Sequence, residues 1–123
     1  MSDFDNVELL EDGEKEPTKD VDIYKQNGIY IHEFKIPFKY DEKIYEKIIF
    51  DFAKLTGKDM LDIENEMTAR GEFVMFTEFS RNYLCNMCAK ASKIGADILT
   101  ALPMRDFNKI MSEARNFLLG TGY

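Results

Sequence analysis

The residues that most constrain the fold lie near the end of the sequence, between Leu99 and Gly120. Pro103 fits the first position of a helix, where an N–H has no partner within the helix, and Gly120 fits the left-handed position just after its end. Between them, six apolar residues follow the spacing that places side chains on one helical face: Phe107, Ile110, Met111, Ala114, Phe117 and Leu118. The pattern predicts an amphipathic helix that closes a small core.

Length and composition are those of one globular domain. The chain has 123 residues, of which 45% are hydrophobic. No apolar run reaches the roughly 18 residues that span a membrane. The first residues also lack the positive and apolar regions of a secretion signal. We therefore expect a cytoplasmic protein that does not bind a membrane.

Negative charge is concentrated in residues 1–20. This segment holds eight acidic residues against two lysines, which accounts for most of the net charge of −7. The remaining chain is nearly neutral and has no basic cluster, so nucleic-acid binding through phosphate neutralisation is not expected. With few apolar residues to bury, residues 1–20 are predicted to be a disordered acidic tail that favours solubility or tethers a partner.

An Asn-Gly pair at positions 27–28 separates two runs of β-type residues. Because both turn residues tolerate positive φ, the pair predicts a hairpin between Val21–Tyr24 and Ile29–Phe38. Pro37 cannot donate a ladder hydrogen bond, so the second strand should end near it or lie at a sheet edge. His32, the only histidine, alternates onto the apolar face. It is interpreted as a buried, hydrogen-bonded core residue and not as a metal ligand or catalytic base.

From Asp41 to Leu55 the apolar spacing changes to that of a helix, and Gly57 supplies a stop just after it. Phe50 lies off the apolar face of this predicted helix, so it either meets the hairpin or is presented to a partner. A shorter helix is predicted over Lys58–Ala69, with Thr56 and Asp59 as a capping pair. The apolar residues that define the 41–55 pattern are Ile44, Tyr45, Ile48, Ile49, Phe52 and Leu55.

The longest helical pattern covers Phe73–Lys93, and Met75 and Phe79 widen its apolar face. A helix that is apolar over more than half its circumference must be buried on two sides, either centrally in the monomer or against another subunit. The pattern therefore favours self-association. Phe50, Met75 and Phe79 are the candidate partner-binding residues.

Cys85 and Cys88 form a C-x-x-C motif in the middle of this pattern. A redox motif needs its first cysteine at a helix N-terminus after a strand, where the dipole stabilises the thiolate. A zinc site needs two further Cys or His ligands, and only His32 remains. We interpret both as reduced cysteines that pack as small apolar side chains, and we expect no metal, cofactor or catalytic residue.

The order of elements predicts one α+β domain over residues 21–123, with an N-terminal β-hairpin packed on four to five helices. Several short motifs occur in a characteristic order along it. They are Gly28 and Pro37 in the hairpin, Leu55-Thr56-Gly57, a break at Gly95, then Ala101, Leu102, Pro103, Asp106 and Phe107, and finally Phe117 and Leu118. In this order and spacing the chain resembles the small tail assembly chaperones of contractile-tailed phages and related prophage elements.

The resemblance implies a non-enzymatic adaptor for virion morphogenesis. Such proteins hold the tape-measure protein while the tail tube polymerises, and leave before the virion is complete. The implied partner is the tape-measure protein, with the tail tube protein as a second candidate. The wide apolar face of the 73–93 pattern adds a further copy of the chain as a partner. Methionine and aromatic side chains can supply the adaptable contacts that this task needs.

Two other functions are alternatives. A small thiol-redox protein would use Cys85 and Cys88, and at least one thiol would then need a lowered pKa. An acidic regulatory protein that mimics nucleic-acid charge would depend on residues 1–20, because the rest of the chain is nearly neutral.

Overall fold

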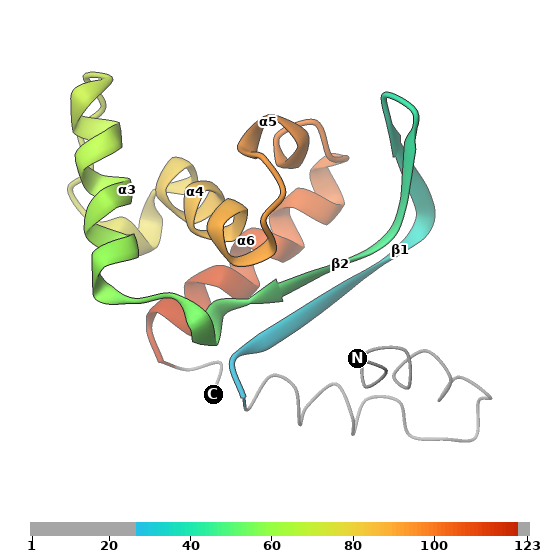
Figure 1. The fold of residues 1–123 in the computed structure, drawn as a ribbon, viewed down its shortest axis with the longest axis horizontal. Helices are drawn as coiled ribbons and strands as arrows, with labels where there is room; N and C mark the ends of the chain where they lie inside the picture. The colour runs from blue at the N-terminus through green and yellow to red at the C-terminus, as the bar shows by residue number, and fades with distance from the viewer. Residues whose placement is uncertain (1–26, 121–123) are drawn as a thin grey trace.

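The structure, a computed structural model, describes residues 27–120. The fold is α+β, as predicted, with a two-stranded antiparallel hairpin packed against four helices (Figure 1). The predicted acidic tail (1–20) and the predicted strand Val21–Tyr24 lie outside the described residues. In chain order the elements are β1 (Ile29–Tyr40), β2 (Lys43–Asp51), the 3-10 turn η2 (Phe52–Lys54), α3 (Gly57–Ala69), the 3-10 turn η3 (Thr77–Phe79), α4 (Arg81–Ser92), α5 (Ala96–Leu99) and α6 (Met104–Leu118).

The hairpin pairs β1 with β2, the strand that follows it in the chain. Tyr30 lies opposite Phe50, and the chain reverses at Asp41, which has a left-handed φ of 59°. Gly28 has the positive φ predicted from the Asn-Gly pair, at 83°. However, the described partner of β1 is β2, whereas the predicted partner was Val21–Tyr24.

The helix predicted over Asp41–Leu55 is wrong, because these residues form β2 and η2. Ile48, Phe50 and Phe52 are buried in alternation, which is the period of a strand. β-branched isoleucines, frequent in this stretch, also suit a pleated surface. Phe50, which does not fit the apolar face of a helix, therefore points into the core from a strand.

β1 does not end at Pro37. Its pairing with β2 is irregular between Glu33 and Phe38, and Pro37 lies within this bulge, where a missing N–H breaks no ladder. The hairpin bends in its distal part and rises on the side where α6 begins (Figure 1). The bulge thus sets the shape of the space between β1 and α6.

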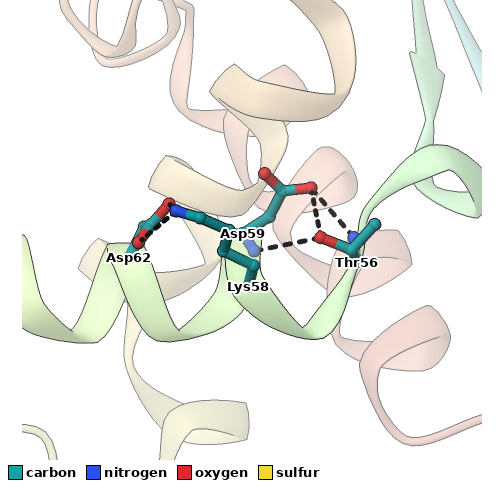
Figure 2. Close-up of polar contacts among 4 residues, drawn as sticks. All are labelled: Thr56, Lys58, Asp59 and Asp62. Atoms are coloured by element: carbon teal, nitrogen blue, oxygen red, sulfur yellow. Dashed lines mark hydrogen bonds and ion pairs between the residues drawn. The ribbon is translucent and has the colours of Figure 1, made fainter.

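α3 begins with the predicted capping pair. The Thr56 hydroxyl accepts a hydrogen bond from the Asp59 backbone N–H at 3.2 Å, and the Asp59 carboxylate accepts one from the Thr56 backbone N–H at 2.9 Å (Figure 2). The hydrogen bond from the Thr56 backbone N–H, and a weaker contribution from the Thr56 hydroxyl 3.2 Å from Asp59 Oδ2, lower the pKa of Asp59. One turn further on, Lys58 and Asp62 form an exposed ion pair at 3.0 Å.

The helix predicted over Phe73–Lys93 is correct only in its second part. α4 begins at Arg81, because the Ser80 hydroxyl caps it by accepting a hydrogen bond from the Tyr83 N–H at 3.1 Å. Residues 73–80 precede it as an irregular segment that includes η3. α4 packs against α3, α5, α6 and β2 and lies at the centre of the helices (Figure 1). Its wide apolar face is therefore covered within the monomer.

The predicted closing helix is α6. Ile110, Met111, Ala114 and Phe117 from the predicted stripe are buried, while Phe107 and Leu118 are half-buried. Pro103 is the N-cap residue and not the first helical residue, and Gly120 has the expected positive φ of 80°. The N-terminal end of this helix lines the space beside β1.

Candidate functional site

The segment Phe73–Phe79 exposes more large apolar side chains than any other stretch of its length among the described residues. Four of its seven side chains are largely in contact with solvent. We call these four residues the aromatic set: Phe73 (82% exposed), Met75 (69%), Phe76 (57%) and Phe79 (70%). So many large exposed apolar side chains in one short segment are uncommon on soluble monomers and mark a candidate interaction site.

Contacts to the helices hold this segment in place. Val74 is half-buried and packs against the core, and η3 contacts both α4 and α6. The Phe79 ring lies edge-on to Phe76 at 6.4 Å between centroids, and the Arg115 guanidinium of α6 lies 5.9 Å from its centroid. The segment thus has an irregular backbone but is held to the rest of the fold through Val74 and through Phe79.

A shallow groove of about 380 Å³ continues from Phe79 along α4 and α6. Leu84 and Met111 contribute apolar atoms to its lining, and Arg81, Asn108 and Arg115 contribute polar ones. The Arg81 guanidinium donates a hydrogen bond to the Asn108 side chain and so fixes the rim. A bound helix or loop would find an apolar anchor at Phe79 and polar partners beside it.

The three predicted partner-binding residues have different positions. Met75 and Phe79 are exposed and belong to the aromatic set. Phe50 is completely buried, so its prediction as a residue presented to a partner is wrong. Phe73 and Phe76 were missed, because the helical pattern assigned them to a core face. The signal that could have identified them is Ser80, a favoured N-cap residue that starts the helix after them.

A second concave site lies between β1 and the start of α6, and we call it the β1–α6 cleft. It has a volume of about 530 Å³. Both ring nitrogens of His32 form hydrogen bonds. Nδ1 lies 2.8 Å from the Tyr30 hydroxyl oxygen, and Nε2 lies 2.7 Å from Asp106 Oδ1. This confirms the prediction of a buried, hydrogen-bonded histidine.

Burial at the β1–α6 cleft changes the pKa of the Tyr30 phenol. Desolvation, aided by the negative charges of Glu113 and Asp106, raises the pKa of Tyr30 well above its usual value. Tyr30 therefore stays protonated at neutral pH and is available as a hydrogen-bond donor. With Tyr30 donating to Nδ1, the other ring nitrogen can donate to Asp106.

The two cysteines are free and buried in the middle of α4. Burial raises the pKa of the Cys85 thiol to about 11 and that of Cys88 well above its ordinary value. A thiol-redox site requires the opposite shift. This arrangement therefore argues against the thiol-redox alternative.

We expect the Cys85 thiol of the native chain to react with a thiol reagent at pH 8 about a hundredfold more slowly than in the urea-unfolded chain, because the rise of its pKa to about 11 depletes the thiolate by roughly that factor. The Cys88 thiol, whose pKa is also raised, should likewise react more slowly than in the unfolded chain. Absorbance of the released thiolate of Ellman's reagent measures both rates. A native cysteine that reacts as fast as in the unfolded chain would restore the redox interpretation.

A scan against protein-family models found no match, and searches of curated proteins and of solved structures found none either. Within residues 27–120, no helix is both long and apolar enough to cross a membrane. The same residues contain no group of three or more His, Cys, Asp or Glu side chains placed to hold a metal ion.

Proposed function

We propose that this chain is a non-enzymatic assembly chaperone for phage tail morphogenesis. In this role it keeps the tape-measure protein soluble in the host cytoplasm while the tail tube assembles. The observation that carries the proposal is the aromatic set, in which four large apolar side chains of one short segment face solvent. Such a surface is costly in water unless a partner covers it.

The chemistry of the aromatic set suits a long, partly apolar helical client. Three phenylalanines and one methionine offer large contact areas without a deep pocket, and methionine adapts its shape to different partners. The neighbouring groove along α4 and α6 extends the surface with polar groups that can fix an orientation. Self-association through the same side chains would cover them when no client is bound.

The sequence resemblance gives the client its identity. The motifs in the second half of this chain have clear structural roles. Gly95 is the N-cap of α5, and Ala101–Phe107 covers the turn before α6 and its first residues. The helix that the resemblance implies before Leu55-Thr56-Gly57 is instead β2 followed by η2. The resemblance therefore rests mainly on the motifs in the second half of the chain.

Co-expression with the tape-measure protein of the same gene cluster tests the proposal. We expect the wild-type chain to raise the soluble yield of that protein and to co-purify with it. Replacing all four residues of the aromatic set with serine should return the yield to that of the tape-measure protein alone, because the exposed contact area is removed. The aromatic set is exposed, so these replacements should leave the fold intact.

The matched control replaces two exposed apolar residues elsewhere, Leu61→Ser on α3 and Leu119→Ser after α6. This variant should keep the client soluble as well as the wild type does. A four-serine variant that still binds, or a control that fails equally, would contradict the assignment of the surface. A wild-type chain without any effect on the client would overturn the proposed function itself.

A further inference from the structure

The β1–α6 cleft has a lining that the proposed chaperone function does not use. Its apolar part comes from Ile36, Pro37 and Phe38 in the bulged half of β1 and from Pro103 before α6. Ile36 is 76% exposed. The cleft is therefore an apolar groove that no described side chain fills.

Basic side chains surround this groove. Lys35 and Lys39 approach from β1, and Arg105 and Lys109 from the first turns of α6. Lys109 is paired with Glu113 at 3.1 Å, whereas Lys35, Lys39 and Arg105 have no ion pair within residues 27–120. The lining also holds two carboxylates, Asp106, which is bound to His32, and the exposed Glu33, so the four basic side chains outnumber them. The chemistry of the cleft thus favours a ligand that combines negative charge with apolar side chains.

One segment of the same chain has this composition. Residues 3–12 read D-F-D-N-V-E-L-L-E-D, which places five carboxylates around Phe4, Val7, Leu9 and Leu10. We propose that residues 3–12 dock in the β1–α6 cleft of their own chain, with the apolar residues on Ile36, Pro37 and Phe38 and the carboxylates beside Lys35, Lys39 and Arg105. This inference does not depend on the proposed function.

The length of the intervening chain fits this docking. Fourteen residues separate position 12 from the described turn at position 27. A flexible chain of that length has a root-mean-square span of roughly 20 Å. From the start of β1 to Lys35 a strand rises by roughly 20 Å at about 3.3 Å per residue. A linker whose span matches the distance gives the docked segment a high effective concentration. A weak contact is then sufficient to keep the cleft occupied.

Photo-crosslinking in the full chain tests the docking directly. Phe4 is replaced by p-benzoylphenylalanine, which retains an aromatic side chain, and the protein is irradiated at low micromolar concentration. We expect crosslinks within one chain, mapped by mass spectrometry to residues 35–39 and 103–109. Crosslinks between chains, to other parts of the same chain, or to no protein residue would each overturn the proposal.

Charge reversal provides the matched control. Lys35→Glu with Lys39→Glu should lower the crosslinking yield roughly fivefold or more, because attraction at the cleft becomes repulsion. Lys54→Glu with Lys58→Glu makes the same charge change on exposed lysines outside the cleft and should leave the yield unchanged. Equal yields in the two variants would contradict docking at the cleft, provided that both unfold at the wild-type urea concentration.

Discussion

Replacing Phe50 with alanine should lower the free energy of unfolding by about 3–5 kcal/mol, the usual cost of removing a buried phenylalanine. Phe50 is fully buried, and its ring lies 6.0 Å from both Tyr30 and Phe52. The lost contacts would open a cavity between the hairpin and the helices. Urea denaturation followed by circular dichroism measures the change.

Ile44→Ala is the matched control for this prediction. Ile44 lies on the same strand but is 61% exposed, so its replacement should cost less than about 1 kcal/mol. Similar losses for the two variants would mean that Phe50 does not face the core. The pair of variants also separates the observed strand from a helix over 41–55, in which Phe50 would lie off the apolar face.

The helices with clear ends could be predicted from the sequence. α3 has Thr56 and Asp59 as a capping box, and α6 has Pro103 before it and Gly120 after it. In both, local end signals agree with the apolar period, so two independent constraints select one structure. The fold class follows from these helices and from the alternation in β1.

The stretch from 41 to 55 shows why apolar spacing alone is insufficient. Ile44, Tyr45, Ile48 and Ile49 fit a helical face, yet short apolar runs fit a strand equally well. What selects the strand is pairing with β1 and burial of Phe50 against the helices, and both depend on residues far along the chain. A residue that does not fit the predicted face, such as Phe50, is the local sign of this error.

The candidate site was the least predictable part. Phe73 and Phe76 follow helical spacing but are exposed, because the assumption that apolar residues face the core fails where a protein displays them. The β1–α6 cleft depends on contact between His32 and Asp106, which are 74 positions apart. Burial of His32 could be inferred from alternation, but its partner could not, since no local pattern links β1 to the start of α6.

The His32–Asp106 contact should couple the stability of the hairpin to that of α6. Asp106→Leu leaves the buried Nε2 of His32 without its acceptor, and we expect a loss of about 1–3 kcal/mol in the free energy of unfolding. Asp106→Asn keeps an oxygen acceptor of the same shape and should cost less than about 1 kcal/mol. Both replacements remove the favourable charge at the first turn of α6, so their difference isolates the hydrogen bond.

A double-mutant cycle with His32→Leu tests whether the two side chains act as a pair. If they do, the double variant His32→Leu with Asp106→Leu should lose less stability than the sum of the two single losses, by about 0.5–3 kcal/mol. The reason is that the second replacement removes a group that the first has already left unpaired. Urea denaturation of the four proteins gives the coupling energy. Additive losses would mean that the 2.7 Å contact contributes nothing to holding β1 against α6.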